Sequence, residues 1–260
     1  MTSPSATHPS FPQTDWHVHA AFYRRGDPTE SARIEPMVEE GARLGLDMMG
    51  IGEHVTASPN HPISCFLELA RDLASASLPI PVFLGPEADI VDERGRLSLP
   101  EGLRERAGLD YVIASVHGIA EFESLRHHLE RYQRRMIGAI SSDNGADVLG
   151  HPWHSGKSLV ANGIVPEWRF ELIPQAMLEE LIDALATHGM ALEINGRSIQ
   201  DFQDPAYRGF VERVRERGIK VSVGSDAHAP DSLERAVHVN RFMAEMGFTR
   251  DQVWLPERAR

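Results

Sequence analysis

The sequence predicts an α/β fold built from about seven strand–helix units. Short apolar runs alternate with longer stretches in which apolar residues recur at helical spacing, a pattern typical of parallel βα units. In addition, nearly every predicted strand ends in His, Asp or Glu. The chain has 260 residues, 42% of them hydrophobic and 25% charged, which suits one large globular domain. Periodicity alone does not distinguish an open sheet from a closed barrel.

The predicted strands and helices alternate along most of the chain. The predicted strands cover residues 14–19, 47–52, 79–84, 109–116, 146–150, 190–194 and 219–223. The predicted helices cover residues 34–44, 63–76, 121–140, 174–188, 205–217 and 231–246. Within 90–99, Asp92-Glu93-Arg94-Gly95 predicts a hairpin turn. The helix over 121–140 is rich in charge, and we expect its His127 and His128 to face solvent.

Composition limits the partners and the location. With 26 basic and 38 acidic residues the net charge is −12, which disfavours binding to long nucleic acids. Cys65 is the single cysteine, which excludes an intrachain disulfide and indicates a reducing, cytoplasmic location. No run approaches the ~20 apolar residues of a membrane span. We expect residues 1–12 to be a disordered lead-in and 13–260 to form a single domain, while the oligomeric state stays open.

The polar residues at the strand ends indicate a metal site. The carboxyl ends of parallel strands meet at one face of an α/β fold, so these side chains should converge there. His17 and His19 alternate along one strand, so both point to the same face and can reach one cation. The other candidates at strand ends are His54, Glu87, His117, His151, Asp226 and His228. So many imidazoles at one face predict bound metal.

Six short motifs carry a family resemblance. They are Asp15-Trp16-His17-Val18-His19, Gly52-Glu53-His54, Gly85-Pro86-Glu87-Ala88-Asp89, Ser115-Val116-His117, Gly150-His151-Pro152 and Gly224-Ser225-Asp226-Ala227-His228. In this order they resemble the PHP (polymerase and histidinol phosphatase) domain family, and in particular a histidinol-phosphatase-like member. The resemblance covers residues 15–228. It implies a distorted, TIM-like (β/α)7 barrel with two or three metal ions at its mouth, and phosphoester hydrolysis as the chemistry.

The resemblance also implies which residues hold the metals. The implied ligands of the first metal are His17, His19, Glu87 and Asp226. The implied ligands of the second are His117, His151 and the bridging Glu87. His54 and His228 resemble two of the three ligands of a third metal.

The third site departs from the family pattern. Its remaining ligand is usually a His about six residues after His19, where this chain has Arg25. Arginine stays charged and cannot coordinate a cation. The third metal is therefore lost, weakly held, or completed by His61 or water. Alternatively, the Arg25 guanidinium replaces the cation and binds the substrate phosphate in a bidentate contact.

The chemistry explains why phosphoester hydrolysis needs such a cluster. Two metal ions about 3.5–4 Å apart lower the pKa of a bridging water and clamp the phosphoryl oxygens. Mixed imidazole and carboxylate ligands suit Zn, Mn or Fe. Asp226 or His228 could assist proton transfer as the catalytic residue.

Two further basic residues are candidates for binding substrate. Arg197 follows a predicted strand end, where a guanidinium could bind phosphate, although a surface ion pair is an equal alternative. Lys157 is a weaker candidate of the same kind. Asp15 and Glu193 are expected to orient the ligating imidazoles through hydrogen bonds.

These observations predict a metal-dependent phosphatase that acts on a small phosphorylated metabolite through a metal-bridged hydroxide, with histidinol phosphate as the first candidate. A close alternative is a PHP-type phosphodiesterase or exonuclease on short oligonucleotides or nucleoside bisphosphates. A non-catalytic, metal-binding PHP domain is the alternative of another class. A metal-dependent amidohydrolase would call for a carboxylated Lys as the bridge, whereas Glu87 fits the phosphoesterase pattern.

Overall fold

The computed structural model describes residues 11–20, 34–56, 64–117 and 123–260. Its strands are β1 (Thr14–Asp15), β2 (Met48–Ile51), β3 (His54–Val55), β4 (Val82–Leu84), β5 (Glu87–Asp89), β6 (Ile113–Ser115), β7 (Val148–Leu149), β8 (Ala191–Asn195) and β9 (Val221–Gly224). Its α-helices are α2 (Ile34–Arg43), α3 (Ser64–Ser75), α4 (Leu103–Ala107), α5 (Leu125–Ser141), α6 (Gly156–Ala161), α7 (Gln175–His188), α8 (Pro205–Glu216) and α9 (Glu234–Glu245). Short 3₁₀ segments include η1 (Phe170–Leu172), η2 (Gly196–Gln203) and η3 (Pro230–Leu233).

The strands form a closed ring of parallel strands. One sheet has the order β1-β2-β4 and the other has the order β3-β5-β6-β7-β8-β9. The chain runs directly from β2 into β3 and from β4 into β5, so each of these pairs counts as one interrupted strand of the ring. A parallel bridge between Val18 and Ala227 joins the last strand to the first, and Trp16 N donates a 2.8 Å hydrogen bond to Val223 O beside it. The expected (β/α)7 barrel is therefore confirmed.

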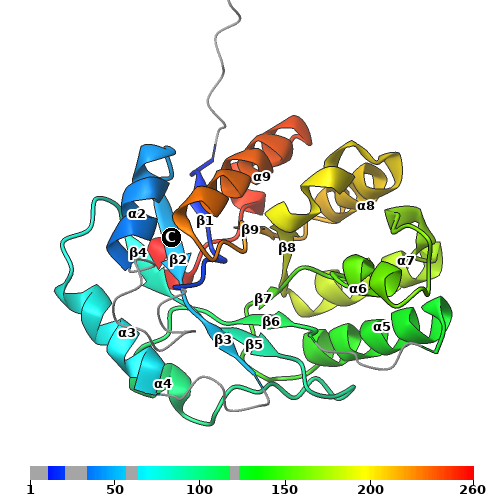
Figure 1. Ribbon diagram of the computed structural model, residues 1–260, viewed down its shortest axis with the longest axis horizontal. Helices are drawn as coiled ribbons and strands as arrows, with labels where there is room; N and C mark the ends of the chain where they lie inside the picture. Colours follow the sequence, from blue (N-terminus) through cyan, green and yellow to red (C-terminus); the bar gives the residue numbers. More distant parts are fainter. Residues whose placement is uncertain (1–10, 21–33, 57–63, 118–122) are drawn as a thin grey trace, which may run out of the picture.

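The helices surround this ring (Figure 1). The long helix α5 begins at Leu125, later than expected, because the Ser124 side chain accepts a hydrogen bond from His127 N and caps the helix there. Its buried face includes His128, whose Nε2 lies 2.8 Å from Ser155 Oγ, so the expectation that His128 faces solvent is wrong. Helices α4 and α6 were not predicted, because each is only one or two turns long.

The hairpin predicted within residues 90–99 is present. Ile90 pairs antiparallel with Leu97 around the Asp92–Gly95 turn, as the predicted hairpin requires. Residues 1–10 of the expected lead-in lie outside the described residues, and Phe11 is buried. Within the described ranges, none of the helices combines the length and apolarity that crossing a membrane would take.

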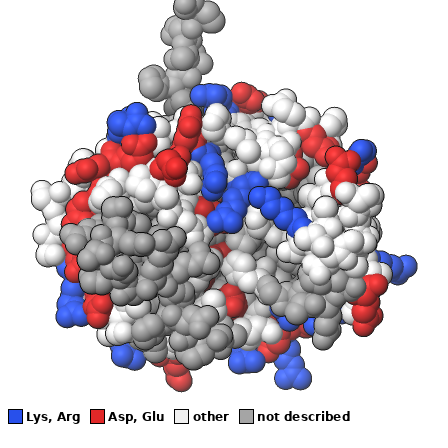
Figure 2. Space-filling model, in the orientation of Figure 1, with Lys and Arg blue, Asp and Glu red and all other residues white. Residues whose placement is uncertain are grey.

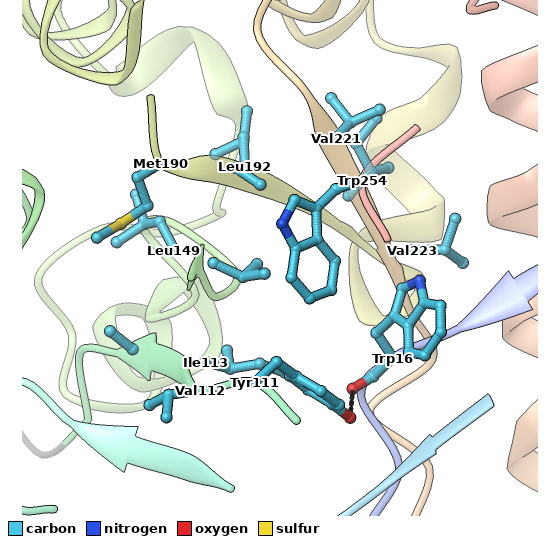
Figure 3. Close-up of a cluster of buried hydrophobic side chains, with 14 of the residues drawn as sticks. Trp16, Tyr111, Val112, Ile113, Leu149, Met190, Leu192, Val221, Val223 and Trp254 are labelled. Atoms are coloured by element: carbon cyan, nitrogen blue, oxygen red, sulfur yellow. Dashed lines mark hydrogen bonds between the residues drawn. The ribbon is translucent and has the colours of Figure 1, made fainter. Parts of the chain in front are cut away.

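An aromatic cluster fills the amino end of the barrel (Figure 3). Trp16 makes edge-to-face contacts with Tyr111 and Trp254, with ring centroids 5.9 Å apart in each pair. Trp254 belongs to the C-terminal segment and donates its backbone N–H to Val221 O at the start of β9. The Tyr111 hydroxyl donates to Trp16 O at 2.6 Å, so this buried polar group is satisfied. Apolar side chains therefore fill the amino end of the barrel, and the polar side chains lie at its carboxyl end.

Candidate metal centre

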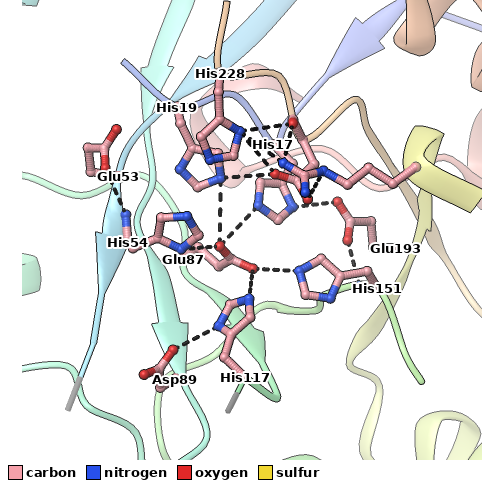
Figure 4. A network of polar contacts seen from close by, with 12 residues as sticks. His17, His19, Glu53, His54, Glu87, Asp89, His117, His151, Glu193 and His228 are labelled. Carbon is pink, nitrogen blue, oxygen red and sulfur yellow. Dashed lines mark hydrogen bonds and ion pairs between the residues drawn. The ribbon is translucent and has the colours of Figure 1, made fainter. Parts of the chain in front are cut away.

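The carboxyl ends of the strands bring the predicted ligands together (Figure 4). His17 and His19 follow β1, His54 begins β3 and Glu87 begins β5. The other four lie beyond the ends of later strands: His117 after β6, His151 after β7, and Asp226 and His228 after β9. Most of these side chains are buried; His54, His117 and His228 are partly exposed. Residues more than 200 positions apart in the sequence thus share one site because the barrel closes.

Glu87 lies at the centre of this cluster, 1% exposed. Both of its carboxylate oxygens face imidazole nitrogens. The Oε1 atom lies 2.7 Å from His151 Nε2 and 3.3 Å from His117 Nε2. The Oε2 atom lies 2.7 Å from His54 Nδ1, 3.3 Å from His17 Nε2 and 3.6 Å from His19 Nε2. One carboxylate placed among five imidazoles is the arrangement that a bridging ligand needs.

The potential ligand atoms fall into compact groups. In the described part of the chain, four sets of three residues have ligand atoms within 4.8 Å of one another: His17-His19-Glu87, His17-His151-Asp226, His54-Glu87-His117 and His19-His54-His228. The first set matches part of the first predicted metal site. His151 belongs to a set with His17 and Asp226 and to none with His117, so the division of ligands between two metals stays a prediction.

The chemistry of the donors fits a cation. His17 Nε2, His19 Nε2 and Asp226 Oδ1 are buried and make no hydrogen bond in the described part of the chain. Buried polar atoms without partners are costly, and they are rare unless a bound group satisfies them. Imidazole nitrogen and carboxylate oxygen are the ligands that Zn and similar divalent metals accept. These residues can therefore hold divalent metal ions.

Neighbouring carboxylates orient two of the imidazoles. Glu193 Oε1 lies 2.6 Å from His17 Nδ1, and Asp89 Oδ1 lies 2.8 Å from His117 Nδ1. Because a carboxylate accepts, each Nδ1 carries the proton and each Nε2 is left to face Glu87. A Cβ atom at residue 224 would overlap Glu193 Oε1, so Gly224 is needed for this contact.

Asp15 plays a different part from the one expected. Its Oδ1 accepts hydrogen bonds from the backbone N–H groups of His17 and Ser225, at 3.2 and 2.9 Å, rather than from an imidazole. It thereby ties the β1 end to the β9 end. Burial raises the pKa of Asp15 to about 7, although its hydrogen bonds with Ser225 and His17 lower it in part.

The surroundings give neighbouring imidazoles different proton affinities. Burial alone would lower the pKa of His17, but the carboxylates of Glu193 and Glu87 outweigh it and raise that pKa well above its usual value. Burial likewise opposes the rise at His117, where Glu87 and Asp89 bring the pKa to about 10. Burial holds the pKa of His19 well below its usual value. Imidazole must be neutral to coordinate, so a metal ion bound at His17 and His117 would have to displace protons from them.

The predicted anion-binding residues lie in different places. Arg197, in η2, contacts the cluster of candidate metal ligands around Glu87, called the centre below. Its Nε lies 2.8 Å from Asp226 Oδ2 and its Nη2 lies 3.1 Å from His228 Nδ1. Lys157, on α6, is exposed and lines a cavity that Arg197 also lines. Arg25 and His61 lie outside the described residues. In the space-filling view, basic side chains cross a hollow near the centre of the face shown (Figure 2).

Two residues at the centre escaped the sequence analysis. Asp89 follows Glu87 by two positions on β5, so strand alternation could have suggested that it faces the same side. His154 has its ring centroid 5.1 Å from that of His151, and burial, followed by the charge of His151, lowers its pKa to about 4. Its spacing of three residues from His151 gave no signal in the sequence, because the loop between them is irregular.

Comparison with known proteins identifies the family. The sequence matches the PHP domain over residues 15–197. The chain belongs to the PHP domain family. Asp226 and His228 lie beyond the PHP match, and their place in the centre is therefore known from the geometry alone.

Similar proteins agree with the PHP assignment. A probable phosphatase of Thermoanaerobacter sp. strain X514 is 27% identical over 244 residues, covering 92% of this chain and 88% of the relative. A probable phosphatase of Aliivibrio fischeri strain MJ11 is also 27% identical, covering 93% and 88%. The crystal structure of a histidinol phosphate phosphatase from Lactococcus lactis, complexed with Zn, L-histidinol and phosphate, shares the fold. It aligns with a TM-score of 0.64 and 19% identity, over 92% of this chain and 95% of that one.

Proposed function

We propose that this PHP protein hydrolyses the phosphate monoester of a small metabolite with the help of bound divalent metal ions. Its family and its relatives identify it as a phosphatase hydrolase. The observation that carries the proposal is the position of Glu87, buried among five imidazoles at the carboxyl end of the barrel. A core that served stability alone would not gather around Glu87 the buried atoms His17 Nε2, His19 Nε2 and Asp226 Oδ1, which make no hydrogen bond within the described residues.

The proposed metal ligands follow the family pattern. One ion would be held by His17, His19, Glu87 and Asp226, and a second by Glu87, His117 and His151. Two such ions supply an activated water and neutralise the phosphoryl charge when bound. Zn, Mn and Fe all suit these ligands, and Zn is present in the structural neighbour from Lactococcus lactis.

A third ion has a weaker case. His54 and His228 are both near His19, whose ring centroid lies 4.1 Å from that of His54 and 4.3 Å from that of His228. These three imidazoles could hold an ion without a contribution from position 25. We therefore keep the third site as a proposal, with Arg25 left to bind phosphate.

The chain's own residues bind the substrate and move protons. Arg197 carries a guanidinium at the edge of the centre, where it could exchange part of its contact with Asp226 for a phosphate oxygen. Lys157 would add positive charge from the neighbouring cavity wall. Asp226 and His228 are the proposed proton-transfer pair, with His228 Nδ1 3.5 Å from Asp226 Oδ1.

Histidinol phosphate is the first substrate candidate. The structural neighbour binds L-histidinol and phosphate, but at 19% identity its likeness supports the fold and only suggests the substrate. We also propose that the chain forms a single PHP barrel from residue 13 onward. Its single cysteine suits a reducing, cytoplasmic location. Its net charge of −12 disfavours long nucleic acids as partners.

One experiment tests the function. Metal content per chain is measured, and the metal-loaded protein is assayed on histidinol phosphate, an aryl phosphate, a nucleoside bisphosphate and a short oligonucleotide. We expect hydrolysis of the monoesters, and His117→Ala should abolish it with little change in unfolding temperature. The matched control is His127→Ala, since His127 lies on α5 outside the centre. Full turnover in His117→Ala, or a protein that binds metal but cleaves none of the esters, would refute the proposal.

A further inference from the structure

Helix α5 is hydrogen-bonded to both chain segments that carry the imidazoles facing Glu87 Oε1. These imidazoles belong to His151 and His117, whose Nε2 atoms lie 2.7 and 3.3 Å from that oxygen (Figure 4). Among the described residues, the last backbone hydrogen bond between the two segments runs from Gly150 N to Ala114 O, before either imidazole. Strand pairing therefore does not reach far enough to fix the distance between the two side chains.

One phenol on α5 links the two segments beyond that point. Tyr132 lies on the buried face of the helix, with 2% of its surface exposed. Its hydroxyl donates a 2.8 Å hydrogen bond to the carbonyl of Val116, the residue before His117. The same oxygen accepts from the backbone N–H of His154, an N–H that is shared with the His151 carbonyl at 3.2 Å. A hydroxyl can donate and accept at once, so one side chain holds both segments.

A second side chain of α5 holds the turn of residues 151–155. His128, one helical turn before Tyr132, has its Nε2 2.8 Å from the Ser155 hydroxyl oxygen. Ser155 is at the N-cap position of α6, where a serine side chain ordinarily accepts a hydrogen bond from the backbone of its own helix. Here it makes no such capping bond. The Ser155 side chain is therefore committed to α5 rather than to α6.

The turn that these contacts hold has a strained backbone. Trp153, in its middle, has a φ of 56°. Ser155 N donates to Trp153 O at 2.7 Å, so the chain turns tightly here. This conformation is costly for a residue other than glycine and persists where surrounding contacts hold it. Loss of the α5 contacts should therefore let the turn relax and carry His151 away from Glu87.

We propose that Tyr132 is a positioning residue of the metal centre, whose hydroxyl sets the separation of His117 and His151 by holding the backbones of both segments to α5. Tyr132 is not itself a ligand and acts through the two imidazoles. His128 supports it by fixing the end of the turn. The inference rests on the metal centre of the proposed function, and it names a residue outside the ligand set on which the affinity for metal at Glu87 Oε1 depends.

Affinity for Zn²⁺ tests the inference independently of hydrolysis. Tyr132→Phe keeps the ring in the core and removes only the hydroxyl. Competition with a zinc-sensitive dye should show about ten-fold weaker binding of one of the two ions and a change of less than about two-fold for the other. Excess Zn²⁺ should bring kcat back to within about two-fold of the wild type, because added metal offsets the weakened site.

Gln133→Met is the matched control. Gln133 is the next residue on α5, and its Nε2 donates 3.0 Å hydrogen bonds to Met177 O and Glu180 Oε2 on α7. The variant loses hydrogen bonds of the same helix to a different neighbour. It should lower the unfolding temperature about as much as Tyr132→Phe does, and leave both Zn²⁺ affinities unchanged.

Ser155→Ala is a second, milder variant. It removes the contact with His128 and keeps the Tyr132 hydroxyl, so the same Zn²⁺ site should weaken by about three-fold. Should Tyr132→Phe fail to fold, this variant decides the question: unchanged Zn²⁺ affinities in Ser155→Ala then overturn the inference.

The outcomes distinguish the inference from the function beneath it. A folded Tyr132→Phe protein with wild-type Zn²⁺ affinities, or with an equal loss in Gln133→Met, overturns the positioning role while phosphatase activity stands. Wild-type protein that shows the expected Zn²⁺ effects in its variants but cleaves no phosphate ester supports the inference and overturns the function. Wild-type protein that binds no Zn²⁺ overturns both.

Discussion

Both ends of the barrel contain buried side chains, but the two sets are chemically opposite. At the amino end, Trp16, Tyr111 and Trp254 pack edge to face, and the Tyr111 hydroxyl has its hydrogen-bond partner. At the carboxyl end, His17 and His19 are just as inaccessible, yet ring nitrogens of both lack hydrogen-bond partners in the described part of the chain. In the aromatic cluster the indole Nε1 of Trp16 also lacks a partner, but at the carboxyl end several such nitrogen and oxygen atoms gather at one place, where a bound cation could satisfy them.

Backbone strain follows the same division. Asp226 has a φ of 52°, and Trp153, in the loop after His151, has a φ of 56°. Residues other than glycine rarely occupy this left-handed region of backbone conformation. Both lie at the carboxyl end. The comparison teaches that the amino end supplies stability, which offsets the cost of holding polar, strained groups for function at the other end.

The largest effect should come from the centre. Glu87→Gln keeps the shape but removes the bridging charge, so we expect kcat to fall by at least ~1,000-fold with loss of bound metal. Steady-state kinetics give the fall in kcat, and metal analysis gives the metal bound per chain. Glu105→Gln, at an exposed position on α4, is the control. A Glu87→Gln protein with wild-type metal content would contradict the bridging role.

The opposite end should respond in the opposite way. Trp254→Ala removes a buried ring from the aromatic cluster and should destabilise the protein by about 3 kcal/mol. Its metal content should stay that of the wild type at temperatures where the variant is folded. Denaturant unfolding gives the stability change, with the exposed Ile199→Ala as a control expected to cost less than about 0.5 kcal/mol. Unchanged stability would show that the cluster does not support the barrel.

A smaller effect should follow from the carboxylate behind His17. Glu193→Gln keeps an acceptor for His17 Nδ1 but removes its charge, so metal affinity should fall roughly 10- to 100-fold. Competition with a metal-sensitive dye measures the affinity. Glu212→Gln, at an exposed position on α8, is the matched control. If affinity is unchanged while folding is impaired, Glu193 serves the barrel instead of the centre.

The smallest effect should come from the edge of the centre. Arg197→Lys keeps the charge but loses the planar fork, so we expect KM for the phosphate ester to rise by roughly five- to ten-fold, with metal content unchanged. Steady-state kinetics check this against Arg126→Lys, an exposed change on α5. A fall in kcat with constant KM would instead place Arg197 in the chemical step.

Much of the fold could be predicted from local patterns. The alternation of apolar runs with amphipathic stretches indicated the βα units, because period and turn residues are properties of neighbouring positions. The long helix nevertheless begins at its Ser124 cap, and one-turn helices such as α6 were missed because they depend on packing. His128 was misjudged, since a charged stretch does not reveal which single position turns inward.

The sequence by itself determined which residue types end each strand, and with them the kind of centre this barrel carries. Only the tertiary structure decided that Glu193 meets His17, that Asp89 meets His117 and that Tyr132 meets the carbonyl of Val116. Side-chain direction along a strand is a local matter, which a period of two reveals. Distances across a barrel depend on strand twist and on ring closure, which no local pattern encodes.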